Sequence, residues 1–279
     1  MPAILLAVIL LLSSAAFVRA DSRWMTLPAT PQLTTADRSG SLKINGANIW
    51  YAIFGRGETV ILLHGGLANA NYWGHQVPEL AKKYQVVVMD SRGHGRSSND
   101  GKPYRYELMA DDVLGVMDAL DIERAAIVGW SDGAIVGLDI AIRRPDRLTK
   151  LFAFAANSDS SGLADVGASP VFKAFVARAE KEYEALSPTP EGYRDLLTAI
   201  QEMWKTQPHY TREQLRAIKT PTWIVTGDHD EAIRREHTEE LATLIPDAGL
   251  LIEPQVSHFS LLQDPEQFTA DVMRFLAKK

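Results

Sequence analysis

Short runs of branched and aromatic residues alternate with longer helical stretches from residue 42 to the end of the chain, and this rhythm restricts the possible folds most strongly. Several of the runs are apolar at every position, as strands buried on both faces of a sheet require. Such strands, separated by helices, build a mostly parallel sheet that is flanked by helices. We therefore predict an α/β fold with an eight-stranded sheet. The predicted strands are 42–44, 49–54, 60–63, 86–89, 125–128, 151–154, 223–226 and 250–252.

Two intervals depart from this rhythm. The first two runs are joined by the turn Asn-Gly-Ala-Asn at 45–48, which predicts an antiparallel hairpin at one edge of the sheet. Residues 159–219 contain no strand pattern, and we interpret them as a helical cap inserted between the two parts of the core, 41–158 and 220–279. The helical patterns in this cap lie near 171–186, 192–205 and 212–218.

The first twenty residues differ in composition from the rest of the chain. A continuously apolar run of about ten residues is followed by small residues and by Val-Arg-Ala at 18–20. This run is shorter than the roughly 20 residues that span a bilayer, and it has the layout of a secretory signal. We predict a signal peptide at 1–20, cleaved after Ala20, and a periplasmic or secreted protein without stable membrane association. An uncleaved N-terminal anchor is the alternative, and residues 21–40 are predicted to be an irregular lead-in.

Composition excludes several classes of protein and of site. The chain is 46% hydrophobic and 23% charged, which is typical of a soluble globular protein rather than a disordered or fibrous one. Its net charge of −6, with no long basic run, argues against nucleic acid as a partner. The absence of cysteine excludes disulfides, thiolate metal sites and a cysteine nucleophile. Because the common metal, dinucleotide and P-loop motifs are also missing, we expect neither a metal nor a cofactor.

The pentapeptide Gly-Trp-Ser-Asp-Gly at 129–133 lies between the predicted strand 125–128 and an apolar helix that starts at Ala134. A Gly-x-Ser-x-Gly sequence in this context is the nucleophile elbow. The turn holds the serine in a strained conformation, and side chains in place of the two glycines would collide with the neighbouring strand and helix. The helix N-terminus also favours developing negative charge. We expect Ser131 to be the catalytic nucleophile; a structural glycine-rich turn is the alternative.

A serine nucleophile needs a base that is oriented by a third group. Asp230 follows the predicted strand 223–226, and His258 lies in the loop after the last strand. Parallel strands bring such side chains to one edge of the sheet. The order Ser131, Asp230, His258 is the one expected of this architecture, so we assign Asp230 as the acid and His258 as the base. Asp228, two residues earlier in the same turn, is the alternative acid.

Acyl chemistry also needs donors for the oxyanion. The strand 60–63 ends in His-Gly-Gly-Leu at 64–67, where the glycines allow a backbone N–H to approach the reacting carbon. We expect the backbone N–H of Gly66 to be one donor, with Leu67 as the alternative. The backbone N–H of Asp132, which follows the nucleophile, is the expected second donor.

The side chain of Asp132 is free for another task. A carboxylate beside a developing oxyanion is electrostatically unhelpful unless it has a partner. We hypothesise that it binds a cationic group of the substrate, such as the α-ammonium of an amino-acid ester, or pairs with Arg178 or Arg194 of the cap. The alternative is that it pairs with an internal group or points to solvent.

With these motifs the sequence resembles the α/β-hydrolase superfamily over nearly all of residues 41–279. The sequence Asp-Ser-Arg-Gly-His-Gly-Arg-Ser at 90–97 is similar to a loop common in these proteins, and we interpret it as architectural rather than catalytic. The elbow followed by Phe-Ala-Ala-Asn at 154–157 resembles the valacyclovir-hydrolase-like branch of serine esterases. This resemblance implies hydrolysis of small esters, amino-acid esters among them, without a cofactor.

The implied mechanism is acyl transfer to Ser131 assisted by His258, followed by hydrolysis by a water that His258 activates. A lactonase or a C–C bond hydrolase with the same three residues is an alternative. A non-catalytic binding protein is a further alternative, although no expected catalytic residue is missing. Aromatic residues of the cap either line an acyl pocket or form ordinary packing: Phe172, Phe175, Tyr183, Tyr193 and Trp204.

Overall fold

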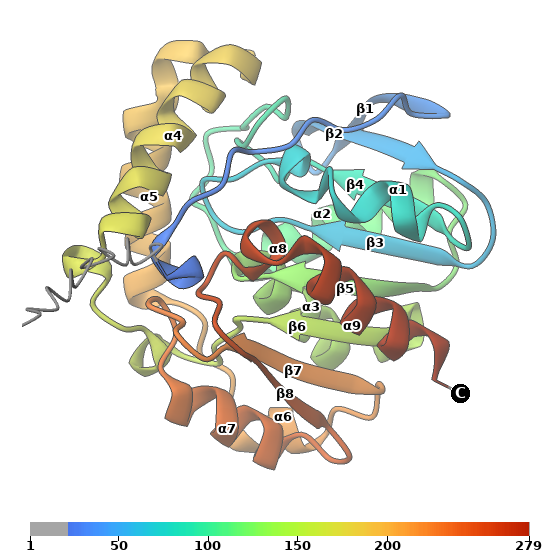
Figure 1. Ribbon diagram of the computed structural model, residues 1–279. Coiled ribbons are helices and arrows are strands. Elements are labelled where there is room, and N and C mark those ends of the chain that lie inside the picture. Colours follow the sequence, from blue (N-terminus) through green and yellow to red (C-terminus); the bar gives the residue numbers. More distant parts are fainter. Residues whose placement is uncertain (1–21, 279) are drawn as a thin grey trace, which may run out of the picture.

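The computed structural model describes residues 22–278, which form a sheet with helices on both of its faces (Figure 1). The predicted signal peptide at 1–20 lies outside the described residues. The strand order is β1-β2-β4-β3-β5-β6-β7-β8; β2 is antiparallel to both of its neighbours, and the other pairs are parallel. The predicted α/β fold with an eight-stranded, mostly parallel sheet is confirmed. The strands are β1 (Arg38–Ile44), β2 (Ala47–Phe54), β3 (Thr59–Leu63), β4 (Gln85–Met89), β5 (Ala125–Trp130), β6 (Leu148–Phe154), β7 (Thr222–Gly227) and β8 (Gly249–Glu253).

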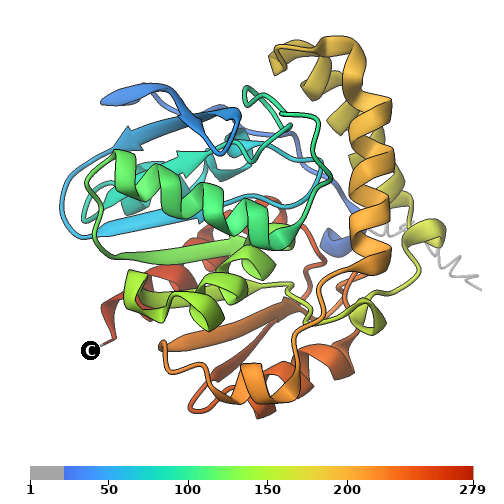
Figure 2. The ribbon, with the colours of Figure 1, turned by 180° about the vertical axis from the view of Figure 1, so that it is seen from behind.

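Helices cover both faces of the sheet. The helices α1 (Gln76–Leu80) and α9 (Pro265–Ala277) lie on the face toward the viewer in Figure 1, and α2 (Tyr106–Ala119) and α3 (Asp132–Arg143) lie on the face toward the viewer in Figure 2. Every residue of β5 is consequently buried, which explains its continuous apolar run. Within residues 22–278, no helix combines the length and the apolar character needed to cross a membrane. The other helices are α4 (Pro170–Leu186), α5 (Tyr193–Thr206), α6 (Arg212–Arg216), α7 (Arg235–Leu244) and α8 (Ser260–Gln263).

The predicted hairpin at the sheet edge joins β1 and β2. Asn45 and Gly46 form the two-residue turn, with φ angles of 47° and 90°, and Ile44 pairs directly with Ala47. Positive φ at both turn positions is the reason why Asn-Gly predicts this hairpin well. The predicted lead-in is wrong at its C-terminal end, because β1 already begins at Arg38. The exposed edge strand shows little apolar periodicity there, so only its backbone pairing with β2 defines it.

The segment predicted as a cap contains the three expected helices in two different surroundings. The helices α4 and α5 stand side by side at the end of the sheet where the parallel strands finish (Figures 1 and 2). Phe175 of α4 anchors this pair, because its ring lies 5.0 Å from that of Phe259 and 6.1 Å from that of Trp130. In contrast, α6 packs against α7 beside the core. The α4–α5 pair, and not α6, therefore lies over the end of the sheet.

The N-terminal segment, residues 22–37, crosses from α8 to the cap. The side-chain amide of Gln263, the last residue of α8, donates to the backbone carbonyl of Thr26 over 2.8 Å. The guanidinium of Arg178 on α4 donates to the carbonyls of Leu27 and Pro28, at 2.8 and 2.5 Å. This segment thus ties α4 of the cap to α8, the helix that follows the loop of His258.

Candidate active site

Ser131 lies at a sharp turn between β5 and α3. Its backbone has φ 55° and ψ −119°, a conformation that is strained for a residue other than glycine. A Cβ atom at Gly129 would collide with the carbonyl oxygen of Gly133, and one at Gly133 would collide with the carbonyl oxygen of Leu63. Both glycines are therefore required by the close approach of strand and helix. The resulting geometry is that of a nucleophile elbow.

The imidazole of His258 is hydrogen-bonded to Asp230. Its Nδ1 lies 3.0 and 3.2 Å from the two carboxylate oxygens, and both side chains are buried. The carboxylate is itself held by the backbone N–H groups of Ala232 and Ile233, at 2.9 and 3.0 Å, and by the hydroxyl of Thr226 at 3.1 Å. These donors fix the orientation of the carboxylate, and the carboxylate in turn fixes the orientation of the imidazole ring.

Asp228, the alternative acid, lies apart from the imidazole. Its carboxylate accepts a hydrogen bond from the backbone N–H of Val256 at 3.3 Å and lies 3.9 Å from the ring of His229. Its side chain is 30% exposed, whereas that of Asp230 is 3% exposed. The structure thus brings Asp230, not Asp228, to His258.

The buried pair shifts the pKa values of both partners. Burial raises the pKa of Asp230, but the charge and the hydrogen bond of His258 outweigh this effect and hold the pKa below its ordinary value. Burial lowers the pKa of His258, and the charge and hydrogen bond of Asp230 reverse this effect, so that its pKa is raised. The arrangement therefore favours a protonated Nδ1 and stabilises an imidazolium when the second nitrogen takes up a proton.

Ser131 and His258 line one cavity of about 80 Å³ beneath the cap. Among residues 22–278, the hydrogen bonds of the His258 ring join Nδ1 to Asp230 and none joins the ring to Ser131; catalytic hydrogen bonds often tighten only when substrate binds. Of the cap aromatics, Phe172 and Trp204 line the cavity, whereas Phe175, Tyr183 and Tyr193 are buried in packing contacts. The other lining residues are Tyr106, Asp132, Asn157, Leu163, Ala164, Val166, Gln207, Ala232 and Ile233.

The His-Gly-Gly-Leu loop lies against the serine. A Cβ atom at Gly65 would be 3.1 Å from the Cβ of Ser131, and one at Gly66 would collide with the carboxylate of Asp132. Leu67 adopts a left-handed conformation with φ 63°. The loop therefore brings backbone within reach of the elbow, and Gly66 and Leu67 stay the expected alternatives for the first oxyanion donor.

His64 fixes this loop from behind. Its Nε2 accepts the backbone N–H of Ser91 at 2.9 Å, and its Nδ1 lies 2.7 Å from the carbonyl oxygen of Gly65. Burial lowers the pKa of His64 to about 4, so the ring is neutral at physiological pH and its Nδ1–H donates to that carbonyl. His64 therefore joins the His-Gly-Gly-Leu loop to the Asp-Ser-Arg-Gly loop that follows β4.

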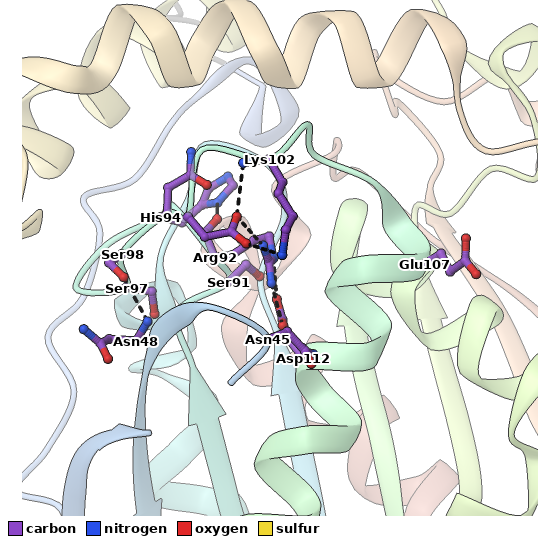
Figure 3. A network of polar contacts seen from close by, with 12 residues as sticks. Asn45, Asn48, Ser91, Arg92, His94, Ser97, Ser98, Lys102, Glu107 and Asp112 are labelled. Atoms are coloured by element: carbon purple, nitrogen blue, oxygen red, sulfur yellow. Dashed lines mark hydrogen bonds and ion pairs between the residues drawn. The ribbon is translucent and has the colours of Figure 1, made fainter. Parts of the chain in front are cut away.

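The Asp-Ser-Arg-Gly loop is held by a buried polar network (Figure 3). The guanidinium of Arg92 binds Asp112 of α2 through two nitrogens, at 2.5 and 2.8 Å, and Asp100 through a third at 3.0 Å. Asn45 of the hairpin turn donates to the same Asp112 at 3.0 Å. His94 is buried, and its Nδ1 faces the carbonyl of Arg92 at 2.8 Å. These contacts give the loop an architectural role.

Asp132 has internal partners. Its buried carboxylate accepts hydrogen bonds from the hydroxyl of Tyr106 at 2.8 Å and from the indole of Trp204 at 2.8 and 3.1 Å. Burial raises the pKa of Asp132 to about 6, against the lowering effect of these two donors. Both hydrogen-bond donors are uncharged, and the charged group that lowers the pKa of this carboxylate is the His258 ring in its protonated form.

The predicted pairing of Asp132 with a basic side chain of the cap is wrong. Arg178 donates instead to backbone carbonyls of the N-terminal segment, and Arg194 is exposed to solvent on α5. The cap does reach Asp132, but through the neutral indole of Trp204. A pattern of helical spacing shows which residues share a face, and it does not show which face turns toward the site.

Two contributors to the site were missed by the sequence analysis. Tyr106 opens α2 and contacts Asp132 from a helix with no recognisable site motif. Glu231 follows Asp230 directly, and its carboxylate accepts the backbone N–H of His258 at 3.0 Å. The doubled acid Asp-Glu after β7 was the available signal for Glu231, whereas nothing in the sequence marks Tyr106. Within the described residues, no cluster of three or more histidine or acidic side chains is arranged to hold a metal ion.

Known proteins resemble this chain in sequence and in structure. The alpha/beta hydrolase fold family matches residues 58–193. A putative carbamate hydrolase, RutD, of Caulobacter sp. (strain K31) is 30% identical over 249 residues, covering 79% of this chain and 91% of that protein. The serine hydrolase BPHL of Mus musculus is 28% identical, with 87% of each chain covered. A meta-cleavage product hydrolase from Pseudomonas fluorescens IP01 has the same fold, with a TM-score of 0.75, 23% identity, and coverage of 85% of this chain and 97% of that one. The chain belongs to the α/β-hydrolase fold family and is a serine hydrolase.

Proposed function

We propose that this protein hydrolyses small carboxylic esters, amino-acid esters among them, through an acyl-enzyme on Ser131. One observation carries the proposal: Ser131 of the elbow, His258, which is hydrogen-bonded to Asp230, and a second buried carboxylate, Asp132, line one cavity. The first three groups supply acyl transfer without any further reagent than water. The fourth supplies a negative charge next to the position that the acyl group would occupy.

The proposed reaction begins when Ser131 Oγ attacks the ester carbonyl while the imidazole of His258 takes its proton. The oxyanion accepts hydrogen bonds from the backbone N–H of Asp132 and from that of Gly66, and the imidazolium then protonates the departing alcohol. A water activated by the same imidazole hydrolyses the acyl-enzyme and restores the serine. Asp230 holds the ring and stabilises its charged form throughout.

The carboxylate of Asp132 is proposed to bind a cationic group of the substrate. A buried carboxylate whose hydrogen-bond donors are all neutral is poorly compensated while the His258 ring is uncharged, and an α-ammonium group would compensate it while lying near the scissile bond. The apolar walls of the cavity, Phe172, Leu163 and Ile233 among them, would accommodate a small acyl side chain. These features support esters of amino acids as the favoured substrates.

A substrate panel tests this proposal. The purified protein is assayed with amino-acid esters, matched esters without the amino group, lactones, and a 2-hydroxy-6-oxo-dienoate; one relative, 28% identical, is a 2-hydroxy-6-oxo-6-phenylhexa-2,4-dienoate hydrolase from Comamonas testosteroni. We expect the highest kcat/KM for the amino-acid esters. Turnover of lactones alone would show that the protein is a lactonase, and turnover of the dienoate alone would show that it is a C–C bond hydrolase. Either result would contradict the proposed ester hydrolysis.

Replacement of Asp132 by asparagine is expected to lower kcat/KM for amino-acid esters by about ten- to a hundred-fold and to spare uncharged esters. The preference of the wild type for charged esters should also fall as the pH drops below about 6, because the carboxylate, whose pKa is raised to that value, is then protonated. Asp139→Asn, at another buried carboxylate on α3, is the control and should leave the preference unchanged. Equal losses on both kinds of ester would assign Asp132 a structural role at the elbow.

We also propose that the mature chain begins at Asp21 and works in the periplasm or outside the cell. The support is the apolar run of about ten residues followed by Val-Arg-Ala at 18–20, the layout of a cleaved secretory signal. Mass spectrometry of the protein exported from its native host should give the mass of residues 21–279. A membrane-bound product that keeps Met1 would show that the segment is an anchor.

A further inference from the structure

Glu231 binds the backbone of His258, and Asp230 binds its ring. Both acids lie in the turn between β7 and α7. The Oε2 of Glu231 accepts the backbone N–H of His258 at 3.0 Å, and its Oε1 lies 3.5 Å from the hydroxyl of Ser257. Two consecutive carboxylates therefore contact the same residue at two different points.

Three side chains together fix His258. Asp230 binds Nδ1 of the ring, Glu231 accepts the backbone N–H, and the indole of Trp130 donates to the backbone carbonyl at 2.9 Å. The preceding part of the loop is attached to the same turn by backbone contacts, since the N–H of His229 donates to the carbonyl of Val256 at 3.1 Å. Because His258 is buried, loss of the Glu231 acceptor would leave its N–H without a partner.

The charged surroundings of the ring are all acidic. Asp230 and Glu231 face His258 from the β7–α7 turn and Asp132 faces it from the start of α3, and each favours the imidazolium. The groups packed against the ring from the cap and from β5 are uncharged, namely Phe172 and Trp130. Burial raises the pKa of Glu231, and His258 and its N–H counter this effect.

We propose that Glu231 is a positioning residue of the active site, which orients the loop of His258 through its backbone N–H and adds a negative charge that favours the protonated ring. This inference rests on the proposed function, in which His258 is the base. Asp230 alone would orient the ring within the loop, whereas Glu231 sets the position of the loop itself relative to β7. Asp230 therefore positions the ring of His258, and Glu231 positions its backbone.

The test compares Glu231→Gln and Glu231→Ala with the wild type by two measurements. The first is the pH dependence of kcat/KM for an uncharged ester, and the second is the NMR titration of the His258 imidazole, assigned with a His258→Asn variant. Glutamine keeps an acceptor oxygen and loses the charge, whereas alanine loses both. Glu236→Gln is the control, because Glu236 is an exposed acid five residues later that makes no contact with His258.

We expect the acid limb of the profile and the NMR titration of Glu231→Gln to move to lower pH by about one unit, since a nearby negative charge that favoured the imidazolium has been removed. The plateau of kcat/KM should stay within a few-fold of wild type. Glu231→Ala should show the same shift with a plateau lower by about ten-fold, and Glu236→Gln should match the wild type.

Superimposable titrations of Glu231→Gln and wild type would overturn the inference, whatever the fate of the alanine variant. The NMR titration needs no substrate, so it decides the inference even if no ester in the panel is hydrolysed. If no ester is hydrolysed, the proposed function fails, but the NMR titration still measures the effect of Glu231 on the His258 ring. A shift in Glu231→Gln that Glu236→Gln reproduces would also overturn it, because any lost charge would then suffice.

Discussion

Ser131→Ala is expected to lower kcat for ester hydrolysis by about 10⁴- to 10⁶-fold. Without the hydroxyl no acyl-enzyme can form, and only the oxyanion donors and substrate binding are left to accelerate attack by water. The backbone at this position is strained, and alanine is no better suited to φ 55° than serine, so the substitution removes the nucleophile without relieving the turn.

A fluorophosphonate probe measures the same prediction directly. Mass spectrometry should place the label on Ser131 in the wild type and find none in Ser131→Ala. Ser158→Ala is the matched control: Ser158 is a second serine beside a histidine, with its hydroxyl 3.1 Å from Nε2 of His237, but it does not lie on the elbow. Undiminished labelling of Ser131→Ala would refute Ser131 as the nucleophile. Loss of labelling in Ser158→Ala would identify Ser158 as the nucleophile instead.

The second large effect is expected for Asp230→Asn, which should lower kcat by about 10³- to 10⁴-fold. The amide oxygen can accept the Nδ1–H but carries no negative charge to stabilise an imidazolium, and the amide NH2 can instead donate to Nδ1 and thereby favour the wrong tautomer. The wild-type contact at 3.0 Å, with both side chains buried, leaves the ring no solvent to replace the lost carboxylate.

Asp228→Asn provides the comparison for this prediction. It removes a carboxylate from the same turn that lies two residues away and is partly exposed, so kcat should stay within a few-fold of wild type. Steady-state kinetics on one uncharged ester compare the two variants. If the magnitudes were reversed, Asp228 would be the acid, and the hydrogen bond between Asp230 and His258 would be structural.

The parts of the molecule that were predictable from sequence are those that local sterics dictate. The Asn-Gly turn specifies its hairpin because both positions need positive φ, and the two glycines of the elbow are required by atoms within a few residues or on the adjacent strand. The buried strands are recognisable because both faces of the sheet are covered, which leaves continuous apolar runs.

The parts that were not predictable depend on how distant segments pack. Tyr106 and Trp204 converge on Asp132 from α2 and from the cap, and no local pattern encodes that meeting. The same holds for Arg178, which turns toward the N-terminal segment and away from the cavity. The start of β1 at Arg38 was missed because an exposed edge strand is defined by its partner and not by its own side chains.

The attachment of the N-terminal segment has a consequence for how this region tolerates change. Arg178 and Gln263 grip it through main-chain carbonyls, those of Thr26, Leu27 and Pro28, which every amino acid supplies. Sequence drift at these three positions would therefore leave the grip intact, whereas a shortened chain that starts at β1 would lose it. Segments of the same length with a different sequence can thus make the same backbone contacts between α4 and α8.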